Sequence, residues 1–151
     1  MQVRRITKRD AAHLRQVRLT ALKEAPSAFG STHAAEANRQ EAEWVQRAVA
    51  GSRGSDRATF FAQLDDEFVG LVGGYREEPS SAIVELVSMW VAPHVRSRGV
   101  GTALVDAVRA WATETNATSI SLWATRRKHT RRTPLQLEGL PRDWRGATSP
   151  I

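Results

Sequence analysis

The most informative stretch of the chain is Glu85-Leu-Val-Ser-Met-Trp-Val-Ala-Pro-His-Val-Arg-Ser-Arg-Gly-Val-Gly-Thr102. A β-prone run leads into a loop with Arg96 and Arg98, and a helical pattern begins at Gly99 and Gly101. The first turn of a helix leaves N–H groups without intrahelical partners, and the macrodipole adds positive charge there. Because glycine keeps no side chain between these donors and a ligand, the junction is a natural anion site, and the arginines favour a diphosphate. Two glycines at a helix start can also serve turning and packing alone.

The loop resembles the acetyl-coenzyme A motif of the GNAT superfamily of N-acetyltransferases, Gln/Arg-x-x-Gly-x-Gly/Ala. The segment from Arg96 to Gly101 matches every fixed position, and a strand that ends in Met89-Trp90-Val91 precedes it at the distance the family uses. The spacing fits neither the P-loop nor the dinucleotide fingerprint. The family splays its fourth and fifth strands apart, and the thioester lies in that gap.

The resemblance also implies which residues hold acetyl-coenzyme A. Backbone groups of Met89 and Val91 would pair with the pantetheine arm as if it were an added strand, with Trp90 in the same contact segment. The expected pyrophosphate contacts are Arg96, Ser97, Arg98, Gly99, Val100, Gly101 and Thr102.

Glu85 is the candidate catalytic residue. The face of a regular strand that carries it also carries Ile83, Val87, Met89 and Val91. A single carboxylate in such an apolar stripe is wetted, is paired or has a raised pKa, and a raised pKa suits a general base that deprotonates an ammonium group. Glu85 precedes Arg96 by 11 positions, about where histone-acetylating members of the family place their catalytic glutamate. A structural ion pair, for example with Arg76, is an equally weighted alternative.

The flanking sequence predicts one α+β domain with a mixed sheet and the element order β-α-α-β-β-β-α-β, which fits the GNAT family's first five strands and three helices. Apolar positions 14, 17, 21 and 22 follow Asp10 on one helical face, and the Asp65-Asp66-Glu67 turn separates two strands of a hairpin. The expected strands are 1–7, 59–64, 68–75, 82–91 and 118–124, and the expected helices are 10–26, 35–50 and 99–115.

Composition excludes several classes of function. The chain has 151 residues and no cysteine, which excludes disulfides, thiolate metal sites and a cysteine nucleophile and fits a cytoplasmic location. Its four histidines lack metal-ligand spacing, so we expect no metal, and no stretch resembles a signal peptide or a membrane span. The net charge is +6, but residues 126–151 contain seven Lys or Arg and two acidic residues, so the rest of the chain is nearly neutral.

The family pattern stops after Ala124. A GNAT member continues with a helix that carries a further coenzyme A contact, often with the tyrosine that protonates the departing thiolate, and with closing strands. Residues 125–151 are instead rich in Arg and Pro and have no sustained period, so we expect an acetyl-CoA-binding domain at 1–124 and an irregular basic tail at 125–151. The only tyrosine, Tyr75, does not match the position of the acid. A shifted reading frame and a functional basic extension both remain open as explanations.

The implied activity is transfer of acetyl from acetyl-CoA to a primary amine of a small molecule or a protein, weakened by the missing acid. The alternative is a non-catalytic acetyl-CoA-binding or regulatory module. Nucleic-acid binding through the tail is the least favoured hypothesis, because a basic run in irregular chain is more often a solvated arm. Many relatives form homodimers, so a homodimer stays open, although the strands that often mediate it are among those missing here.

Overall fold

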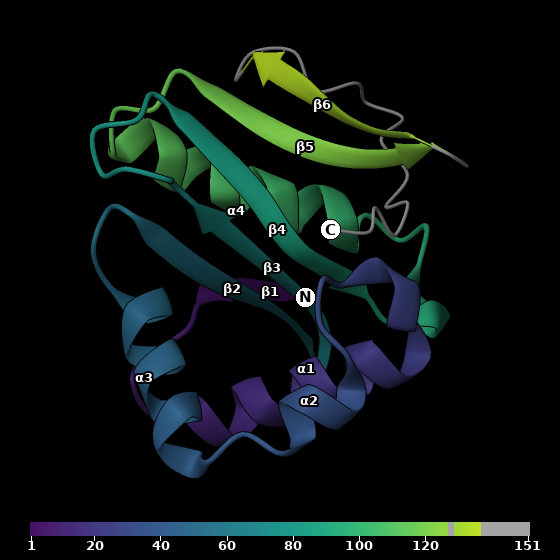
Figure 1. Cartoon of the computed structure of the whole chain (residues 1–151). Helices are drawn as coiled ribbons and strands as arrows, with labels where there is room; N and C mark the ends of the chain where they lie inside the picture. Colours follow the sequence, from purple (N-terminus) through teal and green to yellow (C-terminus); the bar gives the residue numbers. More distant parts are fainter. Residues whose placement is uncertain (127–128, 137–151) are drawn as a thin grey trace.

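The computed structural model describes residues 1–126 and 129–136 of the chain, which form a six-stranded mixed sheet with helices on both faces (Figure 1). The strands are β1 (Gln2–Arg5), β2 (Arg57–Leu64), β3 (Glu67–Tyr75), β4 (Ile83–Val91), β5 (Ser119–Arg126) and β6 (His129–Gln136). The helices are α1 (Ala11–Glu24), α2 (His33–Ala37), α3 (Glu41–Ser52) and α4 (Val100–Glu114), with short 3-10 turns η1 (Pro26–Ala28) and η2 (Pro93–Val95).

The strands lie in the order β1-β2-β3-β4-β5-β6, and every neighbouring pair is antiparallel except the parallel pair β4–β5. Helix α4 packs on one face of the sheet. The approach is so close at Gly70 of β3 that an added Cβ would lie only 2.8 Å from Leu104 Cδ1. Helix α3 packs on the other face, where a Cβ at Gly51 would lie 2.7 Å from Thr59 Oγ1 of β2. The two layers bury one continuous apolar core against the sheet.

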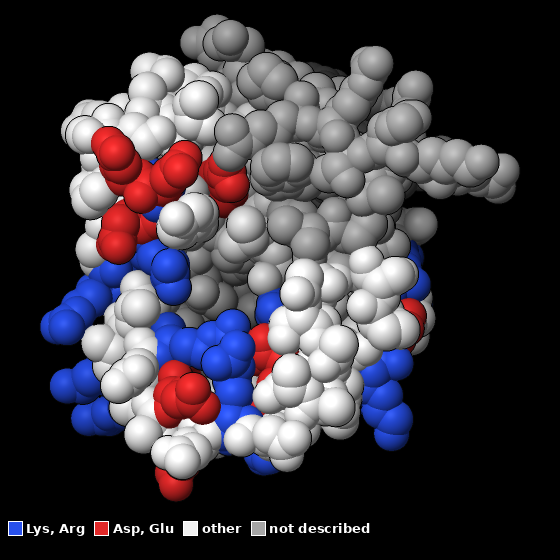
Figure 2. All heavy atoms as spheres, in the orientation of Figure 1, with Lys and Arg blue, Asp and Glu red and all other residues white. Residues whose placement is uncertain are grey.

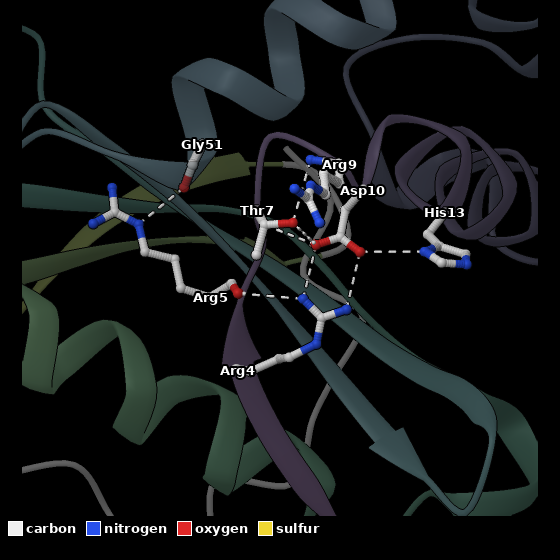
Figure 3. A network of polar contacts seen from close by, with 7 residues as sticks. All are labelled: Arg4, Arg5, Thr7, Arg9, Asp10, His13 and Gly51. Carbon is white, nitrogen blue, oxygen red and sulfur yellow. Dashed lines mark hydrogen bonds and ion pairs between the residues drawn. The ribbon is translucent and has the colours of Figure 1, made fainter.

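A buried carboxylate fixes α1 to β1. Asp10 precedes the first residue of α1, and its carboxylate accepts two hydrogen bonds from the Arg4 guanidinium (2.8 and 2.9 Å) and one from the Thr7 N–H (2.7 Å), as Figure 3 shows. The hydrogen bonds from Arg4 hold the pKa of Asp10 well below its ordinary value, so the carboxylate is ionised at neutral pH. Arg5, which follows Arg4 in β1, donates to the Gly51 carbonyl of α3 (3.0 Å), so β1 is bound to α3 as well as to α1.

The α+β class is confirmed, and the predicted elements occur in the predicted order, with one additional helix and one additional strand. The predicted hairpin, β4, α4 and β5 lie within a few residues of their expected bounds. The predicted helix 35–50 is wrong in one respect, because the chain forms α2 and α3 with a break between them. Gln40 starts a new helix through a capping box in which its N–H donates to the Glu43 carboxylate (2.9 Å). Thr32 caps α2 through its side chain, whose hydroxyl oxygen accepts a hydrogen bond from the Ala35 N–H (3.1 Å).

The tail differs from the expected irregular backbone. Strand β5 continues to Arg126, and residues 129–136 form β6, which pairs antiparallel with β5 from Arg126↔His129 to Ser119↔Gln136. Strand β6 forms by backbone pairing with the edge of β5, and its sequence shows no alternation of apolar and polar residues that would predict a strand. Pro134 is tolerated because β6 is an edge strand. No helix follows α4 among the residues described. Residues 127–128 and 137–151 lie outside the described part, so the predicted boundary between domain and tail stays a prediction.

Two negative findings concern the part of the chain that the structure describes. None of its helices is both long and apolar enough to cross a membrane. Its His, Asp and Glu side chains do not gather in any group of three or more that could hold a metal ion.

Candidate functional site

Strands β4 and β5 pair over only part of their length. The parallel register joins 83–86 of β4 to 119–122 of β5, whereas β4 continues to Val91 and β5 to Arg126. Figure 1 shows the two strands diverging after this shared segment. Residues 87–91 of β4 therefore have no strand partner on the β5 side within the described chain, and such an edge can bind an extended ligand as an added strand.

A β-bulge at Ser88 interrupts β4 next to this open edge. Val87 lies opposite Gly73 of β3 and Trp90 lies opposite Leu71, so β4 contains one more residue than β3 over the same interval. Ser88 has a φ of +55°, a left-handed conformation that is uncommon for a residue other than glycine. Bulges of this kind bend a strand and redirect its side chains, and they are frequent beside active sites.

The bulge corrects one sequence prediction. Glu85 and Val87 share a face, but beyond Ser88 that face continues with Trp90, because Trp90 opposes Leu71 as Val87 opposes Gly73. Met89 and Val91 therefore do not share the face of Glu85. The expectation of one continuous stripe was wrong because the extra residue shifts the two-residue alternation by one.

The backbone polar groups after the bulge point alternately to the two edges of β4. The Ala92 N–H donates to the Val69 carbonyl of β3 (2.8 Å), so the N–H and C=O of Val91 point the other way, toward the open edge. The Val91 carbonyl accepts a hydrogen bond from Arg96 Nε there (3.0 Å), which confirms the direction. The same alternation directs the backbone of Met89 to the open edge.

The loop before α4 presents a group of free backbone donors. Gly99 is the N-cap of α4 with a φ of +81°, and the first recorded hydrogen bond of the helix joins the Ala103 N–H to the Gly99 carbonyl (3.0 Å). Within the described chain, the N–H groups of residues 99–102 donate to no protein acceptor. A Cβ at Gly99 would meet no atom within 4 Å, so the positive φ and open space, rather than tight packing, account for glycine here.

The two arginines of the loop have different surroundings. Arg96 Nη2 donates to the Glu24 carboxylate at the end of α1 (2.8 Å), and the indole N–H of Trp90 donates to the same oxygen (2.9 Å). The charge of Arg96 is therefore already paired, whereas Arg98 is exposed. Sequence reasoning missed Glu24, because its two partners follow it by 66 and 72 residues and no local pattern joins them.

Glu85 is half-buried on the face of the sheet opposite α4, in register with Tyr75 of β3. Arg76, the partner that the sequence allowed for a structural ion pair, is held on the α4 side. Its Nη2 donates to the Thr115 carbonyl (2.9 Å), and its guanidinium lies 5.7 Å from the ring centroid of Trp111.

A cavity of about 340 Å³ lies on the same face as Glu85, beside the bulge. It is bordered by α1, α3 and strands β2 to β4. Its described lining residues are Leu14, Arg18, Arg47, Arg57, Ala58, Thr59, Leu71, Gly73, Gly74, Tyr75, Val87 and Ser88. None of the three arginines was identified from the sequence, because they come from three separate elements and only the fold brings them together.

A model of the GNAT acetyltransferase family matches residues 19–135, which include the end of α1, all of α2 to α4 and strands β2 to β5. The chain belongs to the GNAT acetyltransferase family. The family's cosubstrate is acetyl-CoA, and its members transfer acetyl to an amine acceptor. The match continues to residue 135 and so includes most of β6.

Solved GNAT structures share the fold at low sequence identity. The PaiA N-acetyltransferase of Thermoplasma acidophilum, crystallised with coenzyme A, superposes with a TM-score of 0.66 at 15% identity over 83% of this chain and 80% of its own. An aminoglycoside acetyltransferase from an uncultured soil sample gives 0.68 at 17% identity over 85% and 82%. A GNAT acetyltransferase of Streptococcus pneumoniae gives 0.67 at 18% identity over 84% and 76%. A search of curated proteins found no match to the chain.

The residues of this GNAT domain fit acetyl-coenzyme A in two respects. An extended arm needs an open strand edge with outward N–H and C=O groups, which β4 offers at Met89 and Val91. A diphosphate needs several N–H donors at a helix N-terminus, which residues 99–102 offer.

Proposed function

We propose that this protein is an N-acetyltransferase that moves the acetyl group of acetyl-coenzyme A to the primary amine of a small molecule. The observation that carries the proposal is the coincidence of three features at one end of β4. The open edge beyond Leu86, the donors at the start of α4 and the cavity beside the bulge all lie there. An arm bound along the edge would bring its thioester to the bulge, where an amine in the cavity could reach it.

Bound acetyl-coenzyme A supplies an activated acyl group on a thiolate leaving group. Met89 and Val91 would hold the pantetheine arm through backbone hydrogen bonds, and the loop from Arg96 to Thr102 would hold the pyrophosphate. Trp90 is held in place by the hydrogen bond that its indole N–H donates to Glu24. Arg98 is the exposed charge that can approach the diphosphate, since Arg96 is paired.

Glu85 is the proposed general base. It lies two positions before Val87, which lines the cavity, and on the same face of β4. From there its carboxylate can take the proton of an incoming ammonium, directly or through one water. The neutral amine nitrogen then forms the bond to the acetyl carbon as the carbon–sulfur bond breaks. The nitrogen releases its second proton to water to give the amide, and the thiolate takes one proton from solvent.

A backbone N–H group of β4 that points to the open edge, at Met89 or Val91, is the proposed donor to the carbonyl oxygen on which negative charge develops. A preorganised donor of this kind is typically worth about 3 kcal/mol of transition-state stabilisation. No described residue matches the family's usual acid. Because a thiolate is a fair leaving group without protonation, we expect slow turnover rather than none.

The test begins with the cofactor. Acetyl-coenzyme A is titrated in a calorimeter into the parent protein and into the variants Gly99→Glu and Gly99→Gln. Both variants place a side chain of equal size at the positive-φ position, so they share the backbone strain and differ in charge alone. We expect the glutamate variant to bind at least tenfold more weakly than the glutamine variant, because its carboxylate faces the diphosphate. Equal affinities, or no binding by the folded parent, would refute the loop assignment.

A further inference from the structure

The cavity beside the bulge is lined by positive charge. Arg18 of α1, Arg47 of α3 and Arg57 at the start of β2 all border it, and no Asp or Glu is among its described lining residues. In the orientation of Figure 2, Lys and Arg side chains gather between α3 and the α1–α2 pair. We call Arg18, Arg47 and Arg57 the cavity arginines. Their positive charge is unexpected in a pocket whose proposed substrate carries an ammonium group.

The carboxylate of Glu36 contacts two of the cavity arginines but does not neutralise the group. Glu36 is only 1% exposed and is shared by three guanidinium groups, with its oxygens 2.6 Å from Arg47, 3.2 Å from Arg39 and 3.7 Å from Arg18. Arg57 stacks 5.4 Å from the ring centroid of Tyr75 and forms no ion pair with a carboxylate of the described chain. The cluster therefore keeps a net positive charge on the cavity side.

Arg18 is the most deeply placed of the three. Its side chain is nine-tenths buried, hydrogen-bonds the Ser88 hydroxyl on the bulge and stacks 4.6 Å from the ring centroid of Phe29. Its Nε–H has no acceptor within the described chain. Burial lowers the pKa of Arg18, and the charges of Arg47 and Arg39 lower it further against the attraction of Glu36. An additional anion would relieve this repulsion, and a carboxylate suits the fork of a guanidinium.

We infer that the acetyl acceptor is a small molecule with a carboxylate a few bonds from its primary amine, as in a free amino acid, and that the cavity arginines bind this carboxylate. The inference rests on the proposed transfer reaction. The separation between amine and carboxylate is short because Arg18 contacts the bulge residue Ser88, beside which the amine must meet the thioester. A cavity of about 340 Å³ is at the small end of the range for small-molecule sites.

The same charges also affect the amine. Positive surroundings lower the pKa of a nearby ammonium group, so the acceptor would lose its proton to Glu85 more readily. They also repel polycations. The cavity therefore disfavours aminoglycosides, which are the substrates named for several solved structures of the same fold.

The experiment compares matched acceptors by the release of free coenzyme A. Glycine, alanine, glutamate and phenylalanine are each assayed beside their α-carboxamides, which keep the amine and lose the charge. Phosphonate analogues, an acidic peptide, spermidine and kanamycin complete the panel. We expect kcat/KM at least tenfold higher for one or more amino acids than for the corresponding carboxamide. Equal or faster turnover of the carboxamides, phosphonates, peptide or polycations would overturn the inference and leave the transfer reaction standing.

Two variants connect the preference to the cavity. Arg47→Gln removes one cavity arginine and should reduce the ratio of amino acid to carboxamide at least tenfold, mainly through KM for the amino acid. Arg53→Gln makes the same change at an exposed arginine outside the cavity lining and should leave the ratio unchanged. An unchanged ratio in the folded Arg47→Gln protein would overturn the assignment.

If the protein acetylates none of these amines, the proposed transfer reaction is wrong. The acceptor inference can then be tested separately by measuring binding. The amino acids and carboxamides would be titrated into protein saturated with coenzyme A. Binding of an amino acid but not of its carboxamide, weakened in Arg47→Gln, would support the inference. Absence of amino-acid binding would overturn it.

Discussion

Replacing Glu36 by glutamine removes a carboxylate that contacts the guanidinium groups of Arg18, Arg39 and Arg47. Glu36 is 1% exposed, and its closest partner is Arg47 at 2.6 Å. Removing one partner of a buried ion pair typically costs about 3–5 kcal/mol, because the other charge stays buried and unpaired. The Arg39 and Arg47 side chains are each 35% exposed and can turn toward water, whereas Arg18 at 10% cannot. We therefore expect the lower end, about 3 kcal/mol less free energy of unfolding.

The assay is urea unfolding at pH 7 followed by circular dichroism. With a slope of about 2 kcal/mol per molar urea, the loss corresponds to a midpoint about 1.5 M lower. Glu43→Gln is the matched control, because Glu43 is 47% exposed and lies 3.7 Å from Arg39, and glutamine can keep its capping hydrogen bond. The control should lose less than about 0.5 kcal/mol. A Glu36→Gln protein within the error of the control would refute the argument that the cluster depends on this carboxylate.

The pH dependence of the same pair of proteins gives a second check. Burial alone would raise the pKa of Glu36, but the hydrogen bond and charge of Arg47 with the charges of Arg18 and Arg39 outweigh it, so the pKa lies below its ordinary value of 4.5. A carboxylate with a lowered folded pKa contributes its stability above the unfolded pKa and loses it as the pH falls. The difference between parent and Glu36→Gln should therefore be full at pH 7 and should shrink below about pH 4.5. A difference that grows in acid would contradict this sign.

Two further substitutions test the junction of β1 with α1 and the proposed base. Asp10→Asn should lower the free energy of unfolding by about 1.5–3 kcal/mol at pH 7, because it weakens charge-assisted hydrogen bonds from Arg4. Since the folded pKa of Asp10 is depressed, urea unfolding should show this gap narrowing as the pH falls below 3.8, and a constant gap would refute the ionic explanation. Glu85→Gln should reduce kcat by about 100-fold while calorimetric affinity for acetyl-coenzyme A stays the same. An unchanged kcat, measured against the parent across pH 6–9, would remove Glu85 as the base.

Much of the fold followed from local patterns. The helix α4 and the glycine loop before it could be placed because apolar spacing, Gly99 and Gly101 all act within a few residues. The hairpin of β2 and β3 could be placed from a polar turn between two β-prone runs. Helix α2 was missed as a separate element, because the capping box at Gln40 competes with an apolar pattern that continues through it. Strand β6 was missed because an edge strand stabilised by backbone pairing needs no alternating side chains.

In the candidate site, too, features formed by residues close in the chain could be predicted, and features that depend on strand pairing could not. The proposed diphosphate loop is contiguous in the chain, so its motif can be read from the order of the residues from Arg96 to Thr102. Glu85 could be identified as a candidate, but its neighbours on the strand could not, because the bulge at Ser88 depends on how β4 pairs with β3. Whether Glu85 acts as the base stays a prediction.

The order of the amino acids was sufficient for the class of fold, the family and the position of the glycine loop before α4, since the patterns that predict them lie close together in the chain. The divergence of β4 from β5, the pairing of Arg96 with Glu24 and the cavity arginines depend on residues far apart in the chain. Arg18, Arg47 and Arg57 carry no shared spacing, and their repulsion arises only where α1, α3 and β2 pack around one cavity. The charge of that cavity, and with it the proposed chemistry of the acceptor, is a property of the packed sheet and helices.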